Sequence, residues 1–215
     1  MISIFLIILA YLYGSIPFAL VIGRLFYKTD VRNYGSGNLG GTNTGRVLGK
    51  KAGVLVIILD ASKALLVMFL TRYFCSLLSL NEDTPYICAL FCVIGHCYPV
   101  FANFKGGKAV STAIGYFIAV NPLGAILALV VFFIVLKISK YVSLSSVLAS
   151  LSVLVATPFL DISLIGKLAT AGIILLLVYR HCENLKRVKQ GTESKIIISN
   201  WYDYFIYNIF SIIYS

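Results

Sequence analysis

The chain has 215 residues, of which 60% are hydrophobic and 12% are charged, about half the charged fraction of an ordinary soluble domain. So much apolar surface excludes a soluble globular protein of this size and indicates one membrane domain. The net charge of +10 would suggest a nucleic-acid partner in a soluble protein. Here the basic residues lie between apolar runs, so we expect no nucleic acid but membrane topology and basic loops that meet an anionic substrate.

Apolar stretches follow one another along the chain, and a spanning helix needs about 20 mostly apolar residues. The first stretch lacks the basic start of a cleavable signal peptide, so we interpret it as a retained helix that is interrupted near Pro17. The fourth stretch is divided at Asn121-Pro122. The predicted apolar stretches are 2–26, 53–74, 86–104, 110–136, 144–160 and 168–179.

The number of crossings depends on the stretch 110–136. With the N-terminus outside, the first basic loop and the pair Lys105 and Lys108 fall inside. If 110–136 forms two short helices, Lys137 and Lys140 also fall inside, and every basic cluster lies on the cytoplasmic face. This favours an all-α polytopic membrane helix bundle with seven spans, the N-terminus outside and the C-terminus cytoplasmic. Five spans are the alternative, because such short helices barely cross a bilayer.

Polar residues within the apolar stretches are interpreted as structural. Asp60 and Lys63 lie in the second stretch, and their i, i+3 spacing permits an ion pair on one helix. The five cysteines form no C-x-x-C pair and lie in or beside apolar stretches, which is typical of small buried hydrophobes. We therefore expect no metal site, no disulfide framework and no cofactor.

The first loop is rich in glycine and in neutral hydrogen-bond donors. It reads Gly35-Ser36-Gly37-Asn38-Leu39-Gly40-Gly41-Thr42-Asn43 and continues to Arg46. Glycines let the backbone aim N–H groups at an anion, and the fork of an arginine suits phosphate. The Gly-x-Gly-x-x-Gly match to a dinucleotide fingerprint is weak, because no strand precedes it. A flexible polar turn is the alternative, but the density of donors favours an anion site.

Two further motifs border later stretches. The segment from Gly95-His96 to Gly106-Gly107-Lys108 predicts a second backbone anion site with cationic flanks. His96 can be a base, but a structural histidine is favoured. In the third motif, Arg180-His181-x-Glu183-Asn184, the basic residues are typical membrane-edge anchors. A helix would place His181 and Asn184 on one face.

Taken in order, these motifs resemble one family, the bacterial acyl-phosphate:glycerol-3-phosphate acyltransferases, or PlsY family. The resemblance covers about residues 8 to 193, with departures at Gly41, Thr44, Gly45 and Tyr98. The motifs that carry it are Gly14-Ser15-Ile16-Pro17-Phe18, the loop from Gly35 to Arg46, Asp60-x-x-Lys63, the segment from Gly95 to Lys108 and the segment from Arg180 to Glu193.

The resemblance implies transfer of a fatty acyl group from acyl-phosphate to the 1-hydroxyl of glycerol 3-phosphate. The products are lysophosphatidic acid and phosphate, in the first acylation of phospholipid synthesis. It also implies that a substrate phosphate is the base, and the residues offer no convincing nucleophile–base pair.

The expected location is the bacterial inner membrane, with the active site cytoplasmic. The expected partners are membrane lipid and the enzymes that form acyl-phosphate and perform the next acylation. The alternatives are a transporter of an organic anion and an acyltransferase that uses acyl-CoA or acyl-carrier protein.

Two substrate sites are predicted on this basis. The acyl-phosphate head is expected at Ser36, Gly40, Gly41, Thr42, Asn43, Gly106, Gly107 and Thr112. Glycerol 3-phosphate is expected at Arg46 and Lys108, with Ser146 (or Ser143 in its place), His181 and Asn184 around the glycerol. Ser36, Arg46, Lys108, His181 and Asn184 are the predicted catalytic residues. Asn38, Asp60, Lys63, His96 and Glu183 are predicted to support them.

Residues 196–215 lie beyond the motifs and are expected to be a C-terminal extension of the acyltransferase domain, residues 1–195. Polar residues recur there at three- and four-residue spacing, and Trp201 with several tyrosines prefers the headgroup region. We predict an interfacial amphipathic helix on the cytoplasmic leaflet. An eighth span is the alternative.

Overall fold

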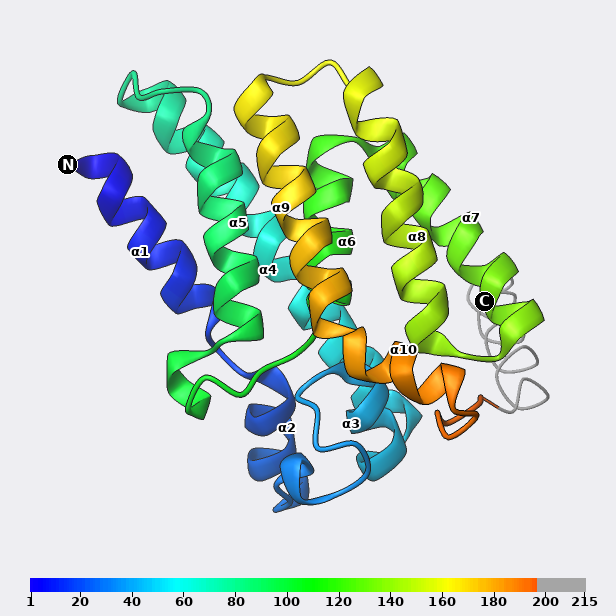
Figure 1. The fold of residues 1–215 in the computed structure, drawn as a ribbon. Helices are drawn as coiled ribbons and strands as arrows, with labels where there is room; N and C mark the ends of the chain where they lie inside the picture. The colour runs from blue at the N-terminus through cyan, green and yellow to red at the C-terminus, as the bar shows by residue number, and fades with distance from the viewer. Residues whose placement is uncertain (197–215) are drawn as a thin grey trace, which may run out of the picture.

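A computed structural model describes residues 1–196 of the chain, and the regular elements in this part are all helices (Figure 1). The helix predicted for residues 196–215 lies outside the described residues apart from Ile196. The α-helices are α1 (Ile2–Gly14), α2 (Phe18–Tyr27), α3 (Gly41–Leu48), α4 (Lys50–Leu77), α5 (Thr84–Cys97), α6 (Val110–Val120), α7 (Pro122–Ser139), α8 (Val142–Ala156), α9 (Leu164–Arg180) and α10 (Cys182–Lys189). Three short 3-10 helices are η1 (Val31–Asn33), η2 (Val100–Ala102) and η3 (Thr157–Phe159).

The long helices alternate in direction through one bundle, so their connections gather at its two ends (Figure 1). The lower end in that view carries α2, α3, α10 and the loop between α5 and α6. Close helix contacts depend on glycine. A Cβ on Gly115 of α6 would lie 1.8 Å from the carbonyl oxygen of Ala61 on α4. Small residues that let backbones approach are typical of helix packing in membranes.

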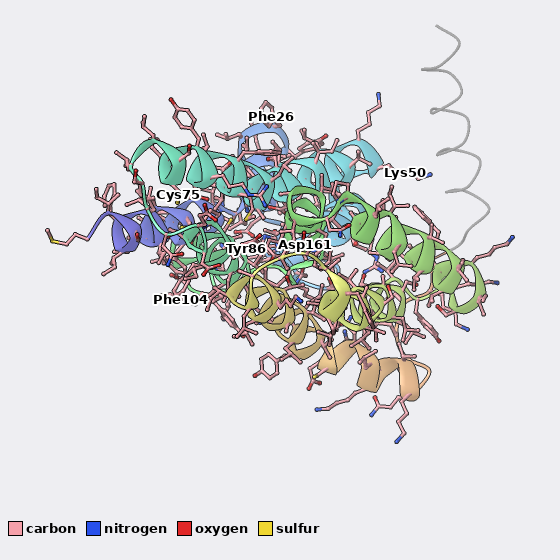
Figure 2. The ribbon with its side chains drawn as sticks, turned by 90° about the horizontal axis from the view of Figure 1, so that it is seen from above. Phe26, Lys50, Cys75, Tyr86, Phe104 and Asp161 are labelled. Atoms are coloured by element: carbon pink, nitrogen blue, oxygen red, sulfur yellow. The ribbon has the colours of Figure 1, made fainter. Side chains whose placement is uncertain are left out.

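Large apolar side chains cover the outside of the bundle (Figure 2). Phe26, which projects from the periphery in that view, is 75% exposed, and Phe69, Ile126 and Leu175 are exposed on other helices. Such a surface suits lipid rather than water. Within residues 1–196, four helices are long and apolar enough to cross a membrane, or up to six if each bent pair, α1–α2 and α9–α10, counts as one span. The predicted count of seven spans stays a prediction.

Two predicted breaks are confirmed in the helices. α1 and α2 meet at a bend of 42° beside Pro17. α6 and α7 are separate helices that meet at Asn121, whose side-chain oxygen accepts a 2.9 Å hydrogen bond from the N–H of Gly124 and caps α7. The predicted stretch 86–104 agrees with one candidate span over Thr84–Ala102, within which α5 ends at Cys97 and η2 follows. The residue before Pro99 is biased away from the helical region, and hydropathy does not register that constraint.

Candidate active site

The predicted polar motifs meet at the lower end of the bundle, where α3, the α5–α6 loop and the α9–α10 junction come together (Figure 1). Lys108 is at their centre and donates a hydrogen bond from Nζ to the side-chain oxygen of Asn184. Burial lowers the pKa of Lys108 to about 8, opposed by the charge of Glu193 and assisted by the positive charges of Arg187, Arg180 and Arg46. The lysine therefore lies in a strongly positive field that suits an anion.

Glu193 connects Asn184 to two other elements. Its Oε1 accepts hydrogen bonds from Asn184 Nδ2 (2.7 Å) and Ser143 Oγ (2.8 Å), and its Oε2 accepts one from Arg187 Nε (2.9 Å). Burial alone would raise the pKa of Glu193, but these hydrogen bonds lower it below its usual value. We call Lys108, Asn184, Glu193, Ser143 and Arg187 the Lys108 network. Glu193 is not among the predicted site residues, although it ends the segment from Arg180 to Glu193 that carries the family resemblance.

The structure distinguishes between the two serines proposed for the glycerol site. Ser143 belongs to the Lys108 network, whereas the Ser146 hydroxyl donates to the backbone oxygen of Val142 at 2.9 Å on its own helix. Ser143 is thus the one of the two that contacts the Lys108 network, and the choice of the serine at the glycerol stays a prediction. Both are buried in α8 one turn apart, so spacing alone did not separate them.

His181 and Asn184 are both buried at the α9–α10 junction, in agreement with the prediction that they share a face. The Nδ1 atom of His181 lies 2.8 Å from the carbonyl oxygen of Leu177. A carbonyl oxygen can only accept, so Nδ1 carries a proton. In the neutral ring, Nε2 is then a hydrogen-bond acceptor that can receive a bond from a substrate hydroxyl.

Gly106 and Gly107 do not offer the backbone anion site that the sequence predicts. Their N–H groups donate to the carbonyl oxygens of Cys97 (3.2 Å) and His96 (3.0 Å) at the end of α5. Their own carbonyl oxygens accept bonds from the Arg180 guanidinium at 3.2 Å each. The two glycines are therefore occupied in fixing the loop that carries Lys108.

Asn43 also differs from its predicted role at the acyl-phosphate head. Its Oδ1 accepts a 2.8 Å bond from the N–H of Ser36, and its Nδ2 donates to the carbonyl oxygens of Val31 (3.0 Å) and Tyr34 (3.3 Å). Both amide hydrogens are thus used within the protein, and Asn43 shapes the first loop. Gly35 has φ +61, and a Cβ there would lie 2.3 Å from Asn43 Oδ1, so the turn requires glycine.

Other predicted residues of the first loop remain available to a substrate. Ser36, Thr42 and Arg46 are exposed, and Thr42 lies in the first turn of α3. The Nδ2 atom of Asn38 donates to the Gly106 carbonyl oxygen at 3.4 Å, which connects the first loop to the loop that carries Lys108. The Thr112 hydroxyl in the first turn of α6 is buried and has no hydrogen-bond partner among the described residues.

Two predictions of supporting roles have different outcomes. Asp60 and Lys63 form the predicted ion pair, with Lys63 Nζ 2.8 Å from Asp60 Oδ1, inside the bundle. Glu183 is exposed and pairs with Lys186 at 2.7 Å on the outer side of α10. Because that pair does not touch the Lys108 network, the structure gives Glu183 no supporting contact with the site.

Comparison with known proteins identifies the family. The family model described as glycerol-3-phosphate acyltransferase matches residues 4–191. The chain belongs to the glycerol-3-phosphate acyltransferase family. A curated relative, glycerol-3-phosphate acyltransferase 2 of Bacillus anthracis, is 45% identical over 195 residues, which are 91% of this chain and 100% of that protein. The Staphylococcus aureus (strain Newman) enzyme is 40% identical and covers 91% of this chain and 98% of its own length.

Solved structures of an acyltransferase of this family have the same fold. PlsY, described as an integral membrane glycerol 3-phosphate acyltransferase, matches in its glycerol 3-phosphate form with a TM-score of 0.83 and 38% identity, over 91% of this chain and 96% of that one. Its lysophosphatidic acid form matches with a TM-score of 0.82 and 37% identity. The chain is thus similar to an integral membrane acyltransferase over nearly its whole described length.

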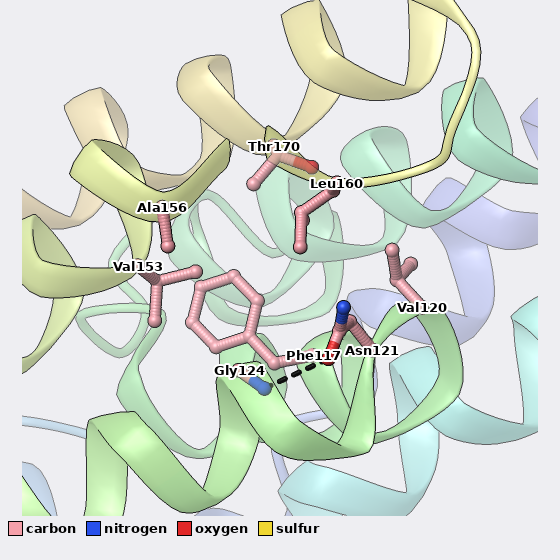
Figure 3. Close-up of a pocket in the computed structure, with 8 residues that line it drawn as sticks. All are labelled: Phe117, Val120, Asn121, Gly124, Val153, Ala156, Leu160 and Thr170. Atoms are coloured by element: carbon pink, nitrogen blue, oxygen red, sulfur yellow. Dashed lines mark hydrogen bonds between the residues drawn. The ribbon is translucent and has the colours of Figure 1, made fainter. Parts of the chain in front are cut away.

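The acyltransferase also has an apolar cavity near the α6–α7 turn, and Figure 3 shows the residues that line it. This turn lies at the end of the bundle opposite the Lys108 network (Figure 1). The residues that line the cavity include no charged group that would bind a phosphate, so it is not the site of a phosphate head. Its lining consists of Phe117, Val120, Asn121, Gly124, Val153, Ala156, Leu160 and Thr170.

Proposed function

We propose that this glycerol-3-phosphate acyltransferase takes its acyl group from acyl-phosphate and transfers it to the 1-hydroxyl of glycerol 3-phosphate. The products are lysophosphatidic acid and phosphate. Family membership supports the acceptor, and the similar PlsY structures are described as glycerol 3-phosphate and lysophosphatidic acid forms. The alternative of an organic-anion transporter is set aside, because the family and the curated relatives are enzymes.

The observation that carries the proposal for the acceptor is the position of Lys108. Its amine contacts Asn184 and lies in the field of Arg46, Arg180 and Arg187. We assign the phosphate of glycerol 3-phosphate to Lys108 and Arg46, since a flexible ammonium and an exposed guanidinium fork together suit a dianion. The glycerol hydroxyls then lie toward His181 Nε2, Asn184 and Ser143.

The acyl-phosphate head is assigned to the first loop. Gly40, Gly41 and Thr42 lie before or within the first turn of α3, where backbone N–H groups and the helix dipole favour an anion. Ser36, whose own N–H is bonded to Asn43, contributes its hydroxyl. The Thr112 hydroxyl, which has no hydrogen-bond partner within residues 1–196, supplies a further donor. Asn43, Gly106 and Gly107 are kept in the proposal as residues that shape the site, in accordance with their hydrogen bonds.

The chemistry needs no covalent enzyme intermediate. The 1-hydroxyl oxygen attacks the acyl carbonyl carbon, and the bond from that carbon to the phosphate oxygen breaks. The phosphate leaves with the electron pair, and the hydroxyl proton passes to a substrate phosphate oxygen. Acyl-phosphate is a mixed anhydride with a good leaving group. The enzyme contributes by bringing the two anions together and by stabilising the charge that develops.

The proposed location is the bacterial inner membrane, with the Lys108 network at the cytoplasmic face. This proposal is supported by the basic loops, which lie at the same end of the bundle as the Lys108 network, as the positive-inside rule expects. We retain seven spans, the N-terminus outside and the C-terminus cytoplasmic as part of this proposal. The same holds for residues 1–195 as the acyltransferase domain and 196–215 as its extension. Membrane lipid and the neighbouring enzymes of phospholipid synthesis are the proposed partners.

Donor exchange tests the reaction directly. The purified protein in detergent is expected to form lysophosphatidic acid from glycerol 3-phosphate and acyl-phosphate, and not from acyl-CoA or acyl-carrier protein. Release of one phosphate for each lysophosphatidic acid formed checks the balance of the reaction. Equal rates with acyl-CoA would contradict the proposed donor while leaving the acceptor in place.

The pKa of Lys108 predicts a loss of acceptor binding at alkaline pH. Burial and the nearby arginines disfavour the ammonium, so the charge is present below about pH 8 and is lost above it. We expect kcat/KM for glycerol 3-phosphate to fall by about tenfold for each pH unit above that value. A pH profile of initial rates measures this. The control is Lys108→Arg, which stays charged and should remove the alkaline decline even if its overall rate is lower. An unchanged decline in that variant would assign it to another group.

A further inference from the structure

Three ionisable side chains lie inside the bundle and take no part in the proposed chemistry. Asp60 Oδ1 is 2.8 Å from Lys63 Nζ and 3.5 Å from His96 Nδ1, and all three residues are at most 6% exposed. We call Asp60, Lys63 and His96 the buried ion cluster. Ionisable groups at membrane depth are costly and generally serve a function. The contacts of the cluster therefore indicate what it does.

Lys63 connects the cluster to the first helix break. Its Nζ donates a 2.6 Å hydrogen bond to the carbonyl oxygen of Ile16 and lies 4.7 Å from the centre of the Phe18 ring. Ile16 is one of the residues between α1 and α2. Lys63 is thus held between the Asp60 carboxylate and the Ile16 carbonyl oxygen. This fixes the position of the carboxylate, which can then orient a third group.

His96 is that third group, and its ring lies against the loop that carries Lys108. Nδ1 faces Asp60, while a Cβ on Gly107 would lie 2.0 Å from Nε2. The far edge of the imidazole thus touches the backbone of Gly107. The N–H of Gly107 also donates to the His96 carbonyl oxygen, and the Gly107 carbonyl oxygen accepts from Arg180. Gly107 is fixed between two side chains, and the next residue is Lys108.

We propose that His96 is a positioning residue for the Lys108 amine. Asp60, fixed by Lys63, orients the imidazole through Nδ1. The opposite edge of the ring contacts the backbone of Gly107 and thereby fixes the position of Gly107 and of the next residue, Lys108. This inference rests on the proposed function, in which Lys108 binds the phosphate of glycerol 3-phosphate. It explains why position 107 is glycine and why the bundle contains an ion pair.

A double-mutant cycle between His96 and Gly107 tests the contact. Gly107→Ala places a methyl group against the ring, and His96→Ala removes the ring. Each single variant is expected to raise KM for glycerol 3-phosphate by about tenfold, because a small displacement of a binding group has a large effect. KM for acyl-phosphate should stay within about threefold. KM for glycerol 3-phosphate of the double variant should not exceed that of the single variant with the higher KM, because the methyl group then fills the space that the ring left.

Two outcomes would overturn the inference. One is a fall in kcat for His96→Ala with KM for glycerol 3-phosphate unchanged, as expected if fewer of the enzyme molecules are active. The other is a KM of the double variant whose fold-change equals the product of the fold-changes of the two single variants. If His96→Ala does not fold, the KM of Gly107→Ala decides, since that change removes no polar group from the bundle.

Gly124→Ala is the matched control. A Cβ at Gly124 would have its nearest neighbour at 3.7 Å, on a helix far from the network, so both KM values should equal those of the wild type. Lys108→Met is measured in the same series. If Lys108→Met raises KM for glycerol 3-phosphate and the His96 and Gly107 variants do not, the inference about His96 is wrong and the assignment of the acceptor site stands. If Lys108→Met also leaves KM unchanged, the assignment of the acceptor site is wrong.

Discussion

Replacing Lys108 with methionine is expected to lower kcat/KM for glycerol 3-phosphate by about 100-fold or more. The change removes the amine that contacts Asn184 and keeps the apolar part of the side chain. Loss of one partner from a hydrogen-bonded charge pair costs about 2–5 kcal/mol, and each 1.4 kcal/mol is about tenfold in rate or affinity. Initial rates at varied glycerol 3-phosphate, with acyl-phosphate saturating, measure the effect.

The control for this change is Lys189→Met. Lys189 is exposed on α10, at the same end of the bundle, and lies outside the Lys108 network. Its removal lowers the net charge by the same amount, so kcat/KM should stay within about twofold at moderate ionic strength. Equal losses in the two variants would mean that general attraction of the anion, and not a specific contact, explains the role of Lys108.

Local geometry accounts for what could be predicted from the sequence. The pair Asp60 and Lys63 was predicted from i, i+3 spacing, and a helix brings such positions together whatever surrounds it. The division at Asn121-Pro122 was predicted at the helix-breaking proline, and the structure adds that Asn121 caps the second helix. These features depend on a few consecutive residues, so no knowledge of the tertiary structure was needed.

The direction of backbone and amide groups could not be predicted in the same way. A glycine pair between two lysines suggests N–H groups free for an anion, but those of Gly106 and Gly107 meet the carbonyl oxygens that α5 leaves unpaired at its end. Asn43 is likewise occupied by loop backbone that lies up to 12 residues away. In both cases the sequence identifies which groups are hydrogen-bond donors. Which carbonyl oxygens accept their hydrogen bonds depends on how the tertiary structure places the loops and helix ends.

Long-range partners were also missed. Glu193 bonds to Ser143, 50 residues earlier in the chain, and to Asn184. No spacing rule connects a glutamate after α10 to a serine at the start of α8. Ser146 was named for the glycerol site with Ser143 as its substitute, because a serine-rich stretch offers several equivalent hydroxyls. The packing of α10 against α8 is what makes Ser143 the one that reaches the network.

Replacing Asp60 with leucine is expected to destabilise the protein more than any surface change. The variant leaves the Lys63 ammonium in the bundle without its carboxylate, and removal of one member of a buried pair costs about 3–5 kcal/mol. For a chain of this size that corresponds to a fall in Tm of about 10 °C. Thermal unfolding of the purified protein in detergent measures it, with Glu183→Gln as the control, since the Glu183–Lys186 pair is exposed and such pairs contribute little.

The double variant Asp60→Leu with Lys63→Met separates stability from positioning. Replacing both ions by apolar side chains of similar volume is often neutral, so we expect Tm to return to near that of the wild type. KM for glycerol 3-phosphate should nevertheless stay raised, because His96 has lost the carboxylate that orients its Nδ1. Recovery of both Tm and KM would show that the buried ion cluster is needed for packing alone. Recovery of Tm without recovery of KM is the result that a positioning role requires, and a structural role does not produce it.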